Sequence, residues 1–246
     1  MINDLTSGQD LSAQQLVEHL APASHVLVGV QADNPDHLAL QLWLLQSLAQ
    51  RRAQGSFLLA MLTPCQQARV GAVQGGIAQG EYPVDLLAAL GWHPEWNWAF
   101  YGPLMRYALA QPYRLLAADL HPDEAQAIQR RPQRLSGMRS TAPAVRHRLL
   151  AHISHRYPEE VGQSMLAVHQ QRDRRMAQAL LDAPLPALLL AGADHVRKDI
   201  GVPLHMADLV GKAEPTVLIL AHAGTTVDAE AADYVWYTTP PSSHES

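Results

Sequence analysis

The chain has 246 residues and a formal net charge of -5 at pH 7, with 48% hydrophobic and 17% charged residues. This length and apolar content allow one sizeable core, and the acidic balance excludes a general attraction to nucleic-acid phosphates. The single cysteine, Cys65, excludes an internal disulfide and a cysteine-rich metal site.

The N-terminus carries no export or lipid-attachment signal. Residues 1–8 lack a basic start followed by an apolar run, and they contain no cysteine that could take a lipid. No apolar stretch reaches the roughly 18 to 20 residues that a membrane helix needs. We therefore expect a soluble protein without a membrane span. As the sequence stands, the expected location is cytoplasmic, or periplasmic or outer-membrane as a lipoprotein if a leader has been removed.

Short apolar runs followed by polar or glycine-containing turns predict strands that are buried on both faces, as in a parallel sheet. These runs are residues 26–30, 57–62, 113–118, 186–191 and 217–221. Helical patterns lie between them, which makes the alternation typical of βαβ units. The sequence therefore predicts an α/β fold with a mostly parallel central sheet flanked by helices.

The clearest helical pattern spans residues 35–50, with Asn34 as the expected N-cap before Pro35. Its apolar face is formed by Leu38, Leu42, Leu45 and Leu48.

A long stretch without strand signal, residues 121–182, predicts a helical excursion from the sheet with helices near 144–154 and 158–181. Residues 233–238 alternate as an edge strand does, and residues 239–246 read as a flexible tail. We therefore expect a lead-in over residues 1–24 and a single α/β domain over residues 25–238.

Ligands of such sheets collect beyond the carboxyl ends of the strands. The strongest candidate segment there, residues 192–205, carries His195, Arg197, Lys198 and His205 on a glycine-bounded loop. These side chains suit a pair of carboxylates, and Lys198 is one of only two lysines in the chain. The alternative is a polar loop that only connects two elements.

Asp33, Asn34 and His37 follow the first strand and could face a ligand, although a capped helix start is the favoured interpretation of Asn34. Residues 168–177 form a charged helix, interpreted as a solvated face with local ion pairs around Asp173. The alternative is an inward-turned arginine or glutamine that orients a ligand.

An aromatic group at residues 92–101 contains three of the five tryptophans, which are expected to anchor the core. Tyr101 lies in the same group, and its hydroxyl needs a partner when it is buried. A phenolate can also ligate ferric iron, so Tyr101 is a candidate ligand.

These segments, in this order, resemble the ChaN-like haem-binding protein family over about residues 25–237. The resemblance rests on Leu27-Val28-Gly29 with residues 33–37, Trp92 with Trp96 and Tyr101, residues 117–120, Gln170 with Arg172-Asp173 and Met176-Ala177, and Ala191-Gly192 with His195-Val196-Arg197 and Gly201-Val202-Pro203. The ordered set carries the resemblance, and the last block is the most telling part of it.

The resemblance implies haem bound in a pocket that dimerisation completes, with two haems face to face. A tyrosine of one subunit would ligate each iron, and a histidine and a lysine of the other would hold the propionates. His195 and Lys198 match that pair, with Arg197 beside them. Tyr101 is the first choice for the iron ligand and Tyr157, in the helical excursion, is the reserve.

The chemistry of ferric haem also requires an iron ligand and cations for the propionates. Its hard iron centre needs a phenolate or an imidazole, its disc needs an apolar slot, and its propionates need cations. A single phenolate ligand suits reversible loading, so we expect haem carriage in uptake or trafficking.

This sequence departs from many relatives at Val30, Ala32 and Ala60, where those relatives carry Gly-Glu-x-His after the first strand and Glu-Met after the second. Groups that bind a metal or move a proton are thus replaced by apolar ones, and we expect no enzyme activity. Two alternatives remain. One is a metal-dependent hydrolase that uses Asp33, His37 and His195, and the other is a non-catalytic protein-binding partner in haem uptake.

Overall fold

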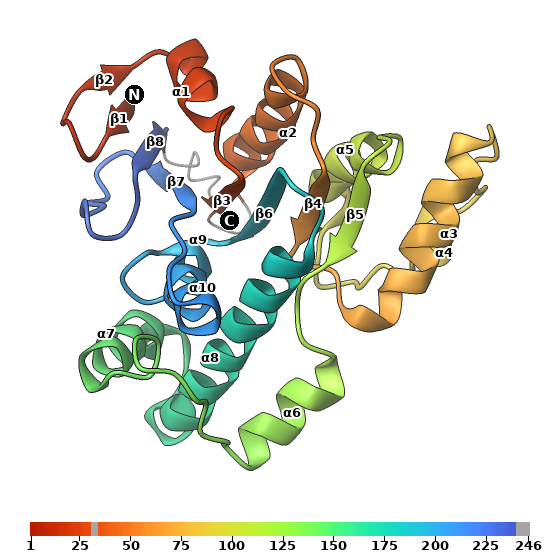
Figure 1. Ribbon diagram of the computed structural model, residues 1–246. Helices are drawn as coiled ribbons and strands as arrows, with labels where there is room; N and C mark the ends of the chain where they lie inside the picture. Colours follow the sequence, from red (N-terminus) through yellow and green to blue (C-terminus); the bar gives the residue numbers. More distant parts are fainter. Residues whose placement is uncertain (31–33, 240–246) are drawn as a thin grey trace, which may run out of the picture.

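The computed structural model describes residues 1–30 and 34–239, and its centre is a sheet of eight strands (Figure 1). The strands are β1 (Ile2–Asp4), β2 (Asp10–Leu11), β3 (His25–Val30), β4 (Ser56–Leu59), β5 (Arg114–Ala117), β6 (Ala187–Gly192), β7 (Thr216–His222) and β8 (Tyr234–Thr238). Their order in the sheet is β2-β1-β8-β7-β3-β6-β4-β5. The six strands from β8 to β5 run parallel, whereas β1 is antiparallel to both β8 and β2.

Helices cover both faces of the parallel sheet. They are α1 (Ala13–Leu20), α2 (Pro35–Ala49), α3 (Gln67–Ala78), α4 (Leu86–Leu90), α5 (Trp98–Leu109), α6 (Pro122–Arg130), α7 (Pro143–Ile153), α8 (Glu159–Asp182), α9 (Ala193–Val196) and α10 (Val202–Val210), with 3-10 turns η1 (Pro64–Gln66) and η2 (Ser154–Arg156). Among the described residues, no helix combines the length and the apolar character needed to cross a membrane.

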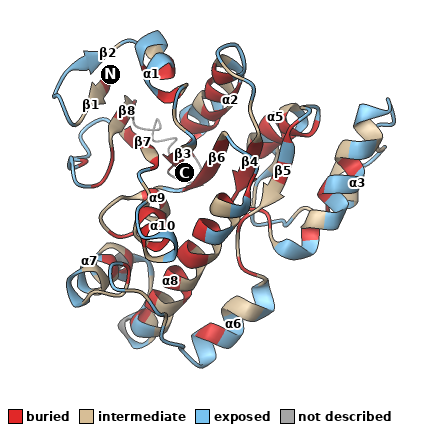
Figure 2. Cartoon of the chain, in the orientation of Figure 1, coloured by how far each residue is buried: buried red, intermediate tan, exposed pale blue. Residues whose placement is uncertain are grey.

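Alternate residues of each central strand enter two different apolar layers, because successive strand side chains point to opposite faces. In β3, Val26 and Val28 join the cluster formed with α2 and α5. Leu27, between them, joins the cluster formed with α8 and α10. Figure 2 shows the result: the strands are buried at the centre, while the outward faces of the helices are exposed.

A crevice is expected at the carboxyl ends of the strands, because connections from neighbouring strands go to opposite faces of the sheet. The helices that follow β3 and β4 pack on the first layer, whereas α8, which leads from the β5 side to β6, and α9 and α10, which follow β6, pack on the second. The helices α6 and α7 pack in two smaller clusters with α8. Because β6 lies between β3 and β4, neighbouring strands send the chain to opposite faces. Open α/β sheets bind ligands at such a point, outside the carboxyl ends of the strands.

The five predicted strands are confirmed, with shifted ends, as β3, β4, β5, β6 and β7. The prediction that all of them are buried on both faces is wrong for β5, which lies at the edge of the sheet and buries only Leu115 fully. The strand expected near residues 233–238 is present as β8, but the prediction that it is an edge strand is wrong. β8 lies between β7 and β1. The strands that cover it have only three and two residues, which is too short for a period-two pattern to be seen.

The predicted helix at 35–50 is confirmed as α2, and its cap is Asn34, whose Oδ1 accepts from the backbone N–H of Asp36 at 2.9 Å and of His37 at 3.4 Å. The helical excursion is also confirmed, since residues 121–182 contain α6, α7 and α8 and no strand. The C-terminal residues 240–246 lie outside the described part of the chain.

The outer edge of the sheet, at β5, is closed by two glutamine side chains of α3. Gln67 donates to the carbonyl of Leu115 at 3.1 Å and accepts from the N–H of Ala117 at 2.7 Å. Gln74 donates to the carbonyl of Tyr113 and accepts from the N–H of Leu115, both at 3.1 Å. Each side-chain amide thus takes the place of a neighbouring strand's backbone, which protects an edge that could otherwise pair with another chain.

Replacing both glutamines with leucine should lower the free energy of unfolding by about 1–3 kcal/mol, because four hydrogen bonds are lost. The freed edge should also promote self-association, measured by sedimentation velocity alongside urea unfolding. Gln79→Leu, at the exposed C-terminal end of α3, is the matched control. Equal self-association of the control and of Gln67→Leu/Gln74→Leu would contradict the protective role.

Candidate functional site

A cavity of about 450 Å³ lies at the carboxyl ends of the central strands, in the crevice described above. Val30 ends β3, Ala60 follows β4, Asp119 follows β5, Gly192 ends β6, and residues 193–195 follow β6. Trp96, which precedes α5, forms another part of the wall. The rest comes from five residues of the helical excursion: Arg156, Tyr157, His169, Arg172 and Met176.

One lining residue, His195, is paired with a carboxylate buried behind the cavity wall. Asp173 of α8 is completely buried, and its Oδ1 lies 2.6 Å from Nδ1 of His195 in α9. Burial raises the pKa of Asp173, and His195 opposes part of that rise. When Nδ1 donates to the carboxylate, Nε2 is the ring nitrogen that remains for a ligand.

Two glycines allow α9 to hold His195 close to the sheet. A β-carbon on Gly201 would overlap the backbone carbonyl oxygen of His195. A β-carbon on Gly29 in β3 would lie only 3.0 Å from Cα of Ala193. The position of His195 therefore depends on the absence of side chains at both sites.

His169 connects this pair to a tyrosine. Its ring stacks on His195, with centroids 4.9 Å apart and an interplanar angle of 15°. Its Nε2 lies 3.5 Å from the hydroxyl of Tyr157. Burial, and then the charges of His195, Arg172 and Arg156, lower the pKa of His169 to about 2. His169 is therefore neutral at physiological pH and positions Tyr157 without adding charge.

The two arginines of the cavity each face an acid. Nε of Arg172 lies 3.1 Å from Oδ1 of Asp119, and Nη2 of Arg156 lies 2.7 Å from Oδ2 of Asp194. Both pairs are only partly exposed, so they are screened less than a surface pair. An anionic ligand in the cavity would meet guanidinium groups already held in place.

Of the sequence-predicted residues, Tyr157 and His195 line this cavity and Tyr101 does not. Tyr101 is 2% exposed in α5 and packs edge-on against Trp96, with ring centroids 5.6 Å apart. Since Trp96 itself lines the cavity, Tyr101 supports the wall from behind.

The other candidates of the loop after β6 are engaged elsewhere. Arg197 makes two hydrogen bonds to Asp199, at 2.9 and 2.8 Å. Nζ of Lys198 lies 2.6 Å from Oδ1 of Asp233, and the lysine side chain is 36% exposed. Neither residue lines the cavity.

The candidates after β3 form a separate cluster. His37 is buried, lies 3.0 Å from Oγ1 of Thr238 through Nε2, and stacks on His222. Ala32 and Asp33, named as a departure and as a candidate, lie outside the described residues. Within the described ranges, no group of three or more His, Cys, Asp or Glu side chains is arranged to hold a metal ion.

The prediction that residues 168–177 form a solvated helix face is wrong, because most of the segment is buried and Asp173 completely so. The alternative of an inward-turned side chain is confirmed as to direction, since Gln170 and Arg174 are buried. His169, Arg172 and Met176 line the cavity from the same helix face, at i, i+3 and i+7. That spacing was visible in the sequence and could have signalled a polar face turned inward. Sequence reasoning missed His169, Asp119, Arg156 and Asp194 as parts of one site. Asp119, Arg156 and His169 are far apart within the connection from β5 to β6, and Asp194 follows β6, so only the tertiary structure brings them together.

Residues 16–206 of the chain match the protein family described as haem-binding uptake, Tiki superfamily, ChaN. Among solved structures, the chain is similar to "Cofacial heme binding to ChaN of Campylobacter jejuni", with 27% sequence identity, a TM-score of 0.85, and coverage of 95% of this chain and 94% of that one. It shares its fold with RRSP, a MARTX toxin effector domain from Vibrio vulnificus CMCP6, at 13% identity and a TM-score of 0.51, over 88% of this chain and 36% of that one. No curated protein matches the chain.

Acid should destabilise the fold through His169. Its pKa is lowered from 6.5 to about 2, so below about pH 6.5 the unfolded chain binds a proton that the folded chain does not. As the pH is lowered below this value, His169 is therefore expected to reduce the free energy of unfolding by up to about 1.4 kcal/mol per pH unit. His169→Gln should reduce the slope, as measured by urea unfolding between about pH 7 and pH 5. The exposed His93→Gln is the control, and identical slopes in wild type and His169→Gln would contradict the prediction.

Proposed function

The chain belongs to the ChaN family of haem-binding uptake proteins, and from this premise we propose that it carries ferric haem with the phenolate of Tyr157 on the iron. The observation that carries the assignment is the place of Tyr157 in the cavity wall, beside His169 and opposite the carboxyl ends of the strands. A phenolate is a hard donor that suits ferric haem iron.

The residues of the cavity fit this group. Val30, Trp96 and Met176 supply apolar surface for the porphyrin disc, and the guanidinium groups of Arg156 and Arg172 suit acidic groups on the haem. Bound haem would supply the iron centre, and the chain's own residues would orient it and hold its acid groups.

Tyr157 is a better ligand than Tyr101 on physical grounds. Tyr101 belongs to the core cluster that includes Leu104 and Met105, so iron could reach its hydroxyl only after the core repacks. Such repacking creates cavities and costs several kcal/mol, roughly 3–5 for a large aromatic. Tyr157 requires no such change, because it is already part of the cavity wall.

We propose that the protein carries haem and does not catalyse a reaction, because two positions of the cavity lining are occupied by apolar side chains. Val30 and Ala60, where many relatives carry acidic residues, line it with apolar side chains. A general acid or base would have to lie within hydrogen-bond reach of a substrate there. An apolar lining favours a bound disc over proton transfer.

The proposed holo form is a dimer around haem, as the resemblance implies. In it, His195 and Lys198 of one subunit hold propionates of the haem bound to the other. Lys198 does not line its own cavity, so its contact would be made across the interface, at the cost of its ion pair with Asp233. Arg197 remains with Asp199 and contributes by keeping this loop in place.

Titration with hemin, followed by absorption, should give a saturable high-spin ferric spectrum with the wild-type protein. Tyr157→Phe removes the phenolate but keeps the ring, and should weaken binding by at least about tenfold, equivalent to 1.4 kcal/mol. Tyr101→Phe is the matched control and should bind like wild type. Loss of the spectrum in Tyr101→Phe alone would move the ligand to Tyr101, and a non-saturating titration of the wild type would contradict the haem assignment.

Sedimentation velocity during the same titration should show a monomer-to-dimer conversion that follows haem occupancy. Lys198→Ala should shift this conversion to higher protein concentration, because a cation is removed from a propionate across the interface. The exposed Lys212→Ala is the control. A haem-loaded monomer at all concentrations would contradict the dimer.

A further inference from the structure

A second, strongly basic region lies on the helical excursion. Between Glu124 and Glu159 the sequence has seven arginines and no aspartate or glutamate, although the whole chain has a net charge of -5. This region runs from the end of α6 through a long connection to α7 and η2 (Figure 1). Such segregation attracts anions toward one side of the protein.

Two adjoining cavities, of about 390 and 480 Å³, are hollowed into this region. They share Arg134, Thr141, Arg146 and Gln163, and together they form a furrow bounded by residues 132–141, α7 and α8. None of their lining residues belongs to the cavity that contains Tyr157. The furrow is therefore a separate place on the molecule.

The charges of the furrow are not balanced within the chain. Among the described residues, Arg134 and Arg146 form no ion pair, whereas Arg148 and Arg175 nearby each face a carboxylate. Leu150 and Leu166 give part of the furrow an apolar lining. The combination of two guanidinium groups with an apolar floor matches a ligand that has both an acid group and an apolar body.

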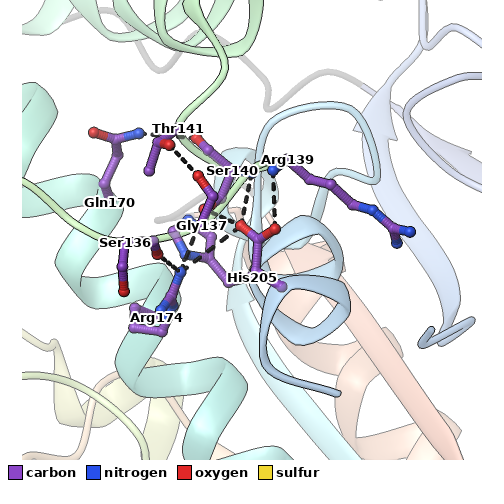
Figure 3. A network of polar contacts seen from close by, with 9 residues as sticks. Ser136, Gly137, Arg139, Ser140, Thr141, Gln170, Arg174 and His205 are labelled. Carbon is purple, nitrogen blue, oxygen red and sulfur yellow. Dashed lines mark hydrogen bonds and ion pairs between the residues drawn. The ribbon is translucent and has the colours of Figure 1, made fainter. Parts of the chain in front are cut away.

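The wall of the furrow is held in one conformation by a buried polar network (Figure 3). Asp208 of α10 accepts from the backbone N–H groups of Arg139 and Ser140, both at 2.9 Å, and from the Ser140 hydroxyl at 2.6 Å. From α8, Arg174 donates to the carbonyl of Ser136 at 2.7 Å and Gln170 to that of Ser140 at 3.0 Å. Partial burial raises the pKa of Asp208, but these hydrogen bonds outweigh it and lower the pKa below its usual value. A preformed wall reduces the entropy that a ligand must lose on binding.

We propose that this furrow is a second ligand site, for a small organic anion that joins a carboxylate or a phosphate to an apolar group. Arg134 and Arg146 bind the acid group through their planar forks, and Gln163 adds a side-chain amide. The apolar part lies against Leu150 and Leu166. The site is independent of haem binding at Tyr157.

The test uses the full chain and three probes: phenyl phosphate, benzoate and neutral benzyl alcohol. Saturation-transfer NMR titrations should show saturable binding of at least one anion and none of the alcohol. The double variant Arg134→Gln/Arg146→Gln should weaken anion binding by at least about tenfold. The matched variant Arg130→Gln/Arg131→Gln removes the same charge at exposed positions outside the furrow lining and should change anion binding by less than about twofold. Binding of phenyl phosphate alone assigns a phosphate ligand, and binding of benzoate identifies a carboxylate.

Three results would overturn the proposal: no saturable binding of either anion, equal binding of benzyl alcohol, or equal weakening in both double variants. Equal weakening in both double variants would mean that anion binding depends on the net charge of the region and not on Arg134 and Arg146. Arg146→Lys, which keeps the charge but loses the fork, should also weaken binding and guards against a misfolded double variant. Hemin titrations of the Arg134→Gln/Arg146→Gln variant should match the wild type, so failure here is distinguishable from failure of the haem proposal.

Discussion

A carboxylate with no exposed surface, Asp173 in α8, ties the helical excursion to the carboxyl edge of the sheet through His195. A buried acid is costly unless it is hydrogen-bonded, so this contact fixes both the rotation of α8 and the plane of the imidazole. The stacked ring of His169 and, through it, Tyr157 then take their places relative to His195. This buried pair therefore sets how the helical excursion and α9 meet at the cavity.

The same helix separates two sites with different chemistry. His169, Arg172 and Met176 turn one face of α8 toward the cavity that contains Tyr157, while Gln163 and Gln170 turn another toward the arginine-lined furrow. A helix can do this because residues three, four and seven apart share a face, while adjacent residues do not. The 24 residues of α8 thus act as a wall between the proposed haem site and the proposed organic-anion site.

The cavity itself is built for binding. Its cations are already paired with acids, and the positions where proton-transfer groups could have been placed carry Val30 and Ala60. Ion pairs of this kind hold guanidinium groups in a fixed orientation, which favours recognition of a carboxylate. These features agree with the haem-binding family to which the chain belongs.

The sequence by itself determined the parallel core strands, the capped start of α2 and the helical excursion, because local period and capping encode each of them. It also identified His195 and, as a reserve, Tyr157, from the resemblance of their segments. Only the tertiary structure decided that Asp173 is buried, that Tyr101 lies behind Trp96, and that β8 is covered by β1. These outcomes depend on contacts between residues far apart in the chain, such as Asp173 with His195 or β1 with β8, and no local pattern records such a contact.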